Sequence, residues 1–192
     1  SILDEASFAA DLAELKRLHN AYGIVYLAHG PEEGAAANPE ILRRQYVPNI
    51  YRMLDGACEL AIRLCTIHFW LDRRFIPQEH LHAKLELLRD MVTYATERNI
   101  VLCIENLSER SSDFADAFAM IDGLGMTLDI GHGALMTRHN TSFEFTRNCF
   151  DRIQHVHIHD NRGGNSPADD LHLPLGEGTI DFAPMLEGLK NR

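Results

Sequence analysis

The sequence has few features of a membrane, disulfide-bonded or nucleic-acid-binding protein. Its four cysteines stand singly, with no Cys-x-x-Cys pair, which favours a reducing compartment over a disulfide framework. No apolar run approaches a membrane span, and the first residues lack a basic segment followed by an apolar one. Lysine and arginine number 18 against 28 acidic residues, and this net charge of −10 disfavours a broad nucleic-acid-binding face but leaves room for a local basic cleft. We therefore expect a cytoplasmic protein that contacts no membrane.

Helical and extended segments alternate along the chain. Spacing of apolar residues, caps and prolines predicts helices over Asp4 to about Asn20, Asn38 to about Leu60, Pro77 to about Asn99, about Ser112 to Asp122, about Phe143 to Phe150, and after Asp181. Short apolar runs predict strands at Ile24–Ala28, Ile62–Ile67, Ile100–Ile104, Met126–Leu128 and Ile153–Ile158. Strands separated by helices are parallel, and their apolar character indicates cover on both faces. The sequence predicts an α/β protein with one domain over residues 1–192.

A histidine or carboxylate stands at the end of every predicted strand. In chain order these residues are His29, His68, Glu105, Asp129 with His132, and His157, and the next loop adds Asp170 and His172. The carboxyl ends of parallel strands lie at one edge of a sheet, so these side chains should gather in one mouth. Each residue alone is more often an ordinary loop residue, but the ordered set predicts a metal site. Imidazole and carboxylate without thiolate suit zinc, manganese, cobalt or iron.

Three histidines alternate with apolar residues in the last strand. His155, His157 and His159 have the period of a strand, so their imidazoles should share one face. A neutral imidazole is the commonest metal ligand, but three strand neighbours do not easily bind one ion. We therefore take His157 as the ligand, His155 as deeper lining, and His159 as lying near the mouth.

Together these motifs resemble the xylose-isomerase-like TIM barrel superfamily, which holds sugar isomerases, sugar epimerases and endonuclease IV. The matching motifs are His29-Gly30-Pro31, His68, Ile104-Glu105-Asn106, Leu128-Asp129-Ile130-Gly131-His132, His155-Val156-His157-Ile158-His159-Asp160 and Asp170-Leu171-His172-Leu173-Pro174-Leu175-Gly176-Glu177-Gly178. The resemblance implies a (β/α)8 TIM barrel, of which the five predicted strands out of eight make a single partial barrel domain. It also implies a further metal-binding glutamate, which would lie beyond Arg192.

The resemblance assigns roles to the residues at the mouth. It implies Glu105, Asp129 and His157 as metal ligands and Glu105 as the catalytic acid or base. It implies His132 as a substrate or second-metal group. In the endonuclease branch, a trinuclear zinc cluster would also use His29, His68, Asp170 and His172. Substrate contacts are expected from His132, Arg162, Trp70 and His68. Trp70 could stack on a sugar face or simply pack in its loop.

From this pattern we predict a divalent-metal-dependent isomerase or epimerase acting on a sugar or sugar phosphate. Moving a proton beside a carbonyl needs an acid or base, supplied by Glu105, and a cation that stabilises the oxygens. Manganese or zinc is the first choice of metal, with magnesium or cobalt as alternatives. The expected partner is a small sugar-like substrate, and the sequence is compatible with a homo-oligomer. Glu177, between two glycines, is more typical of loop geometry than of catalysis.

Two other functions compete with this prediction. An endonuclease IV-like zinc phosphodiesterase acting on abasic DNA is favoured by the occupied extra ligand positions. Against it, the loops Pro31–Ala35 and Ser166–Asp170 are neutral or acidic, and only Arg73, Arg74 and Arg162 offer cations near the mouth. In addition, Glu32 stands where the endonuclease typically has a tyrosine after its proline. The third alternative is a non-catalytic metal- or sugar-binding barrel. Metal content separates them, since one ion favours the isomerase and two or three favour the nuclease.

Overall fold

The computed structural model describes residues 5–190, so the predicted helix start at Asp4 lies outside the described residues. The helices are α1 (Glu5–Tyr22), α2 (Pro39–Ile41), α3 (Val47–Glu59), α4 (Gln78–Thr96), α5 (Ala115–Met120), α6 (Ser142–Asn148) and α7 (Ala183–Lys190). A π-helical turn covers Leu42–Tyr46, and short 3-10 helices cover Ser111–Asp113, His132–Ala134, Phe150–Arg152 and Pro167–Asp169. The strands are β1 (Ala28–His29), β2 (Leu64–His68), β3 (Val101–Glu105), β4 (Gly125–Asp129) and β5 (Ile153–His157). Every predicted helix and strand is therefore represented, with changed limits.

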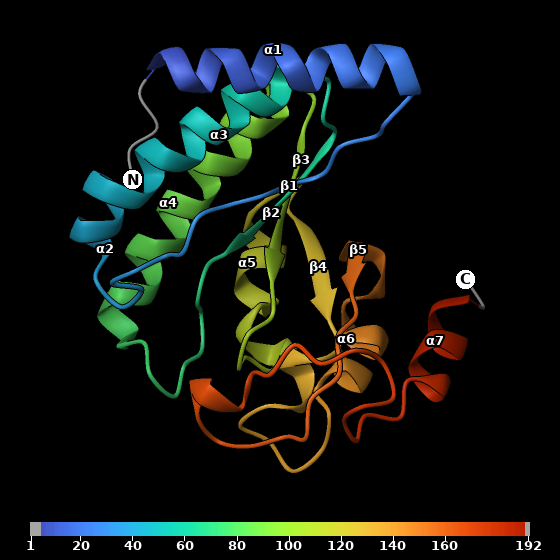
Figure 1. The fold of residues 1–192 in the computed structure, drawn as a ribbon. Helices are drawn as coiled ribbons and strands as arrows, with labels where there is room; N and C mark the ends of the chain where they lie inside the picture. The colour runs from blue at the N-terminus through green and yellow to red at the C-terminus, as the bar shows by residue number, and fades with distance from the viewer. Residues whose placement is uncertain (1–4, 191–192) are drawn as a thin grey trace.

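The five strands form one open sheet in chain order, β1-β2-β3-β4-β5. Each neighbouring pair is parallel, and the register sets His68 beside Glu105 and Asp129 beside His157. Helices α3 and α4 lie side by side along one face of the sheet (Figure 1). The prediction of five parallel strands in sequential order, five of the eight in a closed barrel, is confirmed.

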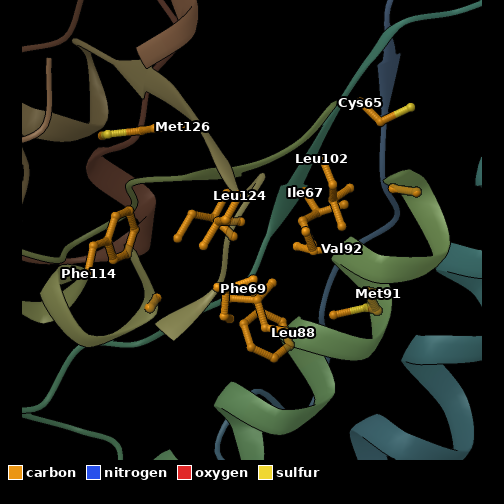
Figure 2. Close-up of a cluster of buried hydrophobic side chains, with 14 of the residues drawn as sticks. Cys65, Ile67, Phe69, Leu88, Met91, Val92, Leu102, Phe114, Leu124 and Met126 are labelled. Carbon is orange, nitrogen blue, oxygen red and sulfur yellow. The ribbon is translucent and has the colours of Figure 1, made fainter. Parts of the chain in front are cut away.

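The two faces of the sheet have different chemistry because side chains alternate along a strand. Cys65, Ile67 and Leu102 point toward α4, where they meet Leu88 and Val92 in the main core (Figure 2). The opposite face is polar and buried, and on it the hydroxyls of Thr66 and Thr127 are 2.7 Å apart. His68 and Asp129 follow these threonines by two residues on the same face. The strand period thus carries polar side chains to the mouth.

The first predicted strand is wrong in its extent. The apolar run Ile24–Ala28 predicted a strand there, but the structure forms β1 only at Ala28–His29. Val25 and Leu27 are 83% and 55% exposed. β1 is the sheet edge and pairs only with β2, so the residues before Ala28 have no ladder partner in the described chain. Composition alone could not reveal that missing neighbour.

The predicted helix from Asn38 toward Leu60 is interrupted. Asn38 does cap its start, because its side-chain oxygen accepts hydrogen bonds from the backbone of Glu40 and Ile41. A π-helical turn then separates α2 from α3 immediately before Pro48. Proline has no N–H to donate to the preceding turn, so the hydrogen-bond register shifts there. Among the described residues, no helix is both long and apolar enough to cross a membrane.

Candidate metal centre

Glu105 lies at the centre of the mouth, at the end of β3, and is 1% exposed. Its Oε1 is 2.9 Å from His157 Nδ1 and 3.3 Å from His132 Nδ1, and its Oε2 is 3.0 Å from His29 Nε2 and 3.5 Å from His68 Nε2. Burial alone would raise the pKa of Glu105, but hydrogen bonds from these four imidazoles hold it well below its ordinary value.

Asp129, at the end of β4, joins the same cluster. Its Oδ2 is 3.6 Å from His132 Nδ1 and 3.8 Å from His157 Nδ1, and its Oδ1 is 3.0 Å from His159 Nε2. The Asn106 side chain pairs with the Asp129 backbone: its Nδ2 donates to the carbonyl at 2.8 Å, and its Oδ1 accepts from the N–H at 2.9 Å. Asn106 thereby fixes the end of β4 and orients the aspartate beside Glu105.

A third set of groups surrounds Asp170, in the loop after β5. Asp170 Oδ2 is 3.3 Å from His132 Nε2 and 3.1 Å from His172 Nε2. The rings of His159 and His172 stack with centroids 3.9 Å apart. Burial would lower the pKa values of His132 and His159, but the neighbouring carboxylates raise both above the ordinary value.

The geometry and chemistry of the cluster fit a divalent cation. Three overlapping groups have ligand atoms within 4.8 Å of one another, namely His29, Glu105 and His157; Glu105, Asp129 and His132; and His132, His159, Asp170 and His172. Asp129 Oδ2, Asp170 Oδ1 and His159 Nδ1 are buried without a hydrogen-bond partner in the described chain. Buried polar atoms are normally paired, and a cation would satisfy these. Imidazole with carboxylate suits zinc or manganese.

The structure thus gathers the predicted ligand residues in one mouth, and their roles as ligands stay a prediction. Of the predicted substrate contacts, His68 and His132 lie within 3.5 Å of Glu105, whereas Trp70 and Arg162 lie farther out. The Trp70 indole donates to Ser108 Oγ at 2.9 Å and stacks on Phe75 with centroids 5.2 Å apart. Arg162 is exposed, and its guanidinium donates to the Glu177 carbonyl at 3.5 Å. Trp70 lies next to the cluster, and Arg162 is engaged with a neighbouring loop.

Sequence reasoning missed two residues of the centre. His159 was expected only near the mouth, yet it belongs to one of the possible metal groups. The strand period places His159 on the same face as His157, and this was a usable sign of a role in the centre. The sequence did not show that the chain after β5 brings the His159 ring to Asp129. The sequence assigned no role to Asn106, although this residue orients Asp129. His155, as deeper lining, packs edge-on against His157 with centroids 5.0 Å apart and belongs to none of the groups.

Asp160 anchors the loop that carries Glu177. Its Oδ2 accepts hydrogen bonds from the backbone N–H groups of Gly176 and Gly178, both at 2.9 Å, and its Oδ1 accepts from Ile180 at 3.1 Å. Burial would raise the pKa of Asp160, but these backbone donors hold it below its ordinary value. A Cβ at Gly178 would overlap the Asp160 carboxylate, so only glycine fits there. Glu177 itself is exposed, which agrees with a role in the loop.

We expect Asp160→Asn to loosen this loop, because an amide offers one acceptor oxygen where the carboxylate offers two. Losing these bonds should lower the free energy of unfolding by about 1–3 kcal/mol. Hydrogen exchange should quicken at the amides of Gly176, Gly178 and Ile180. Since the folded pKa lies below the unfolded one, the carboxylate stabilises the protein above about pH 4 and loses this effect as the pH falls. Asp181→Asn, at an exposed helix cap, is the control; equal exchange in both variants would contradict the anchor role.

Comparison with known proteins agrees with this geometry. The model of the family described as xylose isomerase-like TIM barrel matches residues 4–192. An uncharacterized protein of Methanocaldococcus jannaschii, MJ1311, is 29% identical over 92% of this chain, which spans 64% of that relative's length. A D-tagatose 3-epimerase-like protein shares 28% identity and a TM-score of 0.80, over 98% of this chain and 73% of its own. The IOLI protein with a bound zinc atom has the same fold, with 14% identity and a TM-score of 0.74 over 98% and 72%. The chain belongs to the xylose isomerase-like TIM barrel family.

Proposed function

We propose that this chain is the metal-binding part of a divalent-metal-dependent isomerase or epimerase that acts on a sugar or sugar phosphate. The observation that carries the proposal is the buried Glu105 carboxylate, surrounded by four imidazoles from four parts of the chain. Such a group is held in place and can exchange a proton with a bound substrate. The likeness to a D-tagatose 3-epimerase-like protein supports the same class of reaction.

The metal would be held by Glu105, Asp129 and His157, since His157 Nδ1 is 2.9 Å from Glu105 Oε1 and 3.8 Å from Asp129 Oδ2. His132 lies close to both carboxylates and belongs with them to one possible metal group. When bound, a divalent cation supplies Lewis-acid polarisation of a carbonyl oxygen. The surrounding residues fix these ligands, because Asn106 holds Asp129 and the strand register sets Asp129 beside His157. The site is thus preorganised, and little rearrangement should accompany metal binding.

Proton transfer is the task of Glu105. Its carboxylate accepts a proton from the carbon beside the substrate carbonyl, and the electron pair of that C–H bond moves toward the carbonyl. Glu105 then returns the proton to carbon in an isomerisation, whereas an epimerisation needs a second group on the opposite face. His29 and His68, both close to Glu105 Oε2, stabilise the ionised carboxylate before it accepts the proton and after it has returned it.

A zinc phosphodiesterase remains the second candidate, because one observation favours it. The group of His132, His159, Asp170 and His172 offers a cation position beyond the ligands that a one-metal isomerase uses. A cluster of ions could generate hydroxide and bind the oxygens of a phosphodiester. The loop Ser166–Asp170 next to this group remains acidic, which disfavours a DNA backbone along that edge.

The decisive experiment uses the full-length, metal-loaded protein in D2O with a panel of ketoses and ketose phosphates. We expect deuterium to replace the hydrogen beside the carbonyl of at least one of them, detected by NMR, and one tightly bound metal ion per chain by elemental analysis. Chelator-treated protein is the control and should show no exchange. Incision of abasic-site DNA by a protein with two or three ions, together with no exchange on any ketose, would overturn the proposal.

A further inference from the structure

A second depression opens at the same end of the sheet and has a different charge. Its walls come from the loops after β3, β4 and β5, and they are Arg110, Met136, Thr137, Arg138, His139 and Asn165. All three loops leave the carboxyl ends of their strands, as the residues of the metal centre do. From the sequence, only Arg73, Arg74 and Arg162 were expected as cations near the mouth. Arg110 and Arg138 were not expected there. The mouth is therefore less acidic than the sequence predicted.

The two new arginines differ from their neighbours in having no carboxylate partner. Arg73 pairs with Asp116 at 2.6 Å and Arg74 pairs with Asp72 at 2.6 Å. Neither Arg110 nor Arg138 forms an ion pair within the described chain. Two unpaired guanidiniums at one depression, in a chain of net charge −10, create a local excess of positive charge.

Two aspartates in the loops of this depression accept hydrogen bonds from the backbone. Asp113 Oδ2 accepts the backbone N–H of Arg110 at 2.8 Å. Asp169 Oδ2 accepts the backbone N–H groups of Asn165 and Ser166 at 3.0 and 2.9 Å. Neither aspartate forms an ion pair with Arg110 or Arg138 in the described chain, so both guanidiniums are open to an anion from solution.

An apolar cavity of about 240 Å³ lies beside the metal centre. Trp70, Leu107, Leu135, Met136 and Pro167 line it, together with His132 and Asp170 of the metal centre. Met136 also lines the basic depression. The apolar cavity therefore shares lining residues with both the metal centre and the basic depression.

The backbone at Met136 is held in an unusual conformation. Its φ is +53°, a left-handed value that residues other than glycine seldom adopt. The Met136 N–H donates to the Gly164 carbonyl at 2.7 Å, and its own carbonyl accepts from Arg74 Nη1 at 3.4 Å. Such strain persists where the surroundings fix it, and it tends to mark binding sites. Here it fixes the wall between the cavity and the depression.

We propose that the basic depression binds the phosphate group of a phosphorylated sugar whose reacting end lies at Glu105. This inference rests on the proposed function and specifies its substrate class. The C–H face of the sugar packs on Trp70 and Met136, and the phosphate accepts hydrogen bonds from the Arg110 and Arg138 guanidiniums, which suit phosphate geometry. A neutral sugar would leave both cations unpaired, so the site discriminates against it.

The test is calorimetric titration of metal-free, full-length protein with inorganic phosphate, D-fructose 6-phosphate and D-fructose. We expect the two phosphate-containing probes to bind and D-fructose to bind at least tenfold more weakly. The double variant Arg110→Gln/Arg138→Gln should bind both phosphate probes at least tenfold more weakly. The matched control Arg52→Gln/Arg89→Gln removes the same charge from exposed positions on α3 and α4 and should bind like the wild type.

Two results would overturn the inference. One is phosphate binding that is the same in the Arg110/Arg138 variant and the wild type, with both proteins melting at the same temperature. The other is a variant that binds a DNA duplex more weakly than the wild type does but binds D-fructose 6-phosphate equally well. That result would assign the two arginines to binding a phosphodiester. Because the titration needs neither metal nor turnover, its outcome is independent of the deuterium-exchange test of the proposed function.

Discussion

Glu105→Gln in the full-length protein is expected to lower kcat by roughly 10³-fold while leaving the fold intact, since general acid–base groups contribute about 10²–10⁴-fold. Glutamine has nearly the same shape but cannot accept a proton from carbon. It also removes the negative charge that faces four imidazoles, so less metal should remain bound. The measurements are deuterium exchange into the substrate, metal content by elemental analysis, and far-UV circular dichroism.

Glu177→Gln is the matched control for this variant, because it makes the same chemical change at an exposed loop position. It should retain wild-type exchange and metal content. Full activity in Glu105→Gln would contradict the assignment of Glu105 as the acid or base, even if metal were still bound. Loss of activity in Glu177→Gln with full metal content would move the catalytic role to the Gly176–Gly178 loop.

The convergence of the metal centre could be predicted because it follows from strand direction. Glu105, Asp129 and His157 end their strands, and parallel strands bring such residues together whatever the loops do. Side chains on a strand point to the same face at every second residue, which explains why Thr66 and Thr127 lie on the face that carries Glu105, Asp129 and His157. These features depend on local periodicity, which a single sequence contains.

Loop positions could not be predicted in the same way. Arg110 and Arg138 follow different strands and line the same depression. The loop that carries Arg138 is held by the backbone hydrogen bond from Met136 to Gly164. That contact joins residues far apart in the chain and leaves no periodic signal. The predicted extent of β1 was wrong for a related reason. The length of this strand depends on a neighbouring strand and not on the apolar run Ile24–Ala28. Sequence reasoning therefore found the ligands but not the basic depression beside them.

The largest expected effect on stability comes from Lys84, which also left no clear signal in the sequence. It lies on α4 and is 0% exposed. Its ammonium contacts Glu33 Oε1 and the Ala36 carbonyl, and it lies 4.4 Å from the centre of the Phe69 ring. Glu33 Oε2 in turn accepts the backbone N–H of Trp70 at 2.7 Å. This buried ion pair ties the loops after β1 and β2 to the helix, and both loops carry residues of the mouth.

Lys84→Met is expected to lower the free energy of unfolding by about 3–5 kcal/mol at pH 7, because it leaves the Glu33 carboxylate buried without a cation. Burial already raises the pKa of Glu33 above its ordinary value of 4.5, and losing Lys84 should raise it further. A group with a raised folded pKa stabilises the protein below its unfolded pKa and loses this effect as the pH rises. The loss in the free energy of unfolding caused by Lys84→Met should therefore be small near pH 4 and complete at pH 7.

The double variant Lys84→Met/Glu33→Gln separates the buried charge from the lost packing. The glutamine introduced at position 33 can still accept the Trp70 N–H, and no charge remains buried, so most of the lost stability should return at pH 7. Urea unfolding of the single and double variants at pH 4 and pH 7 gives the comparison. If the double variant were as unstable as Lys84→Met at both pH values, contacts of the Lys84 side chain other than the ion pair would account for the loss.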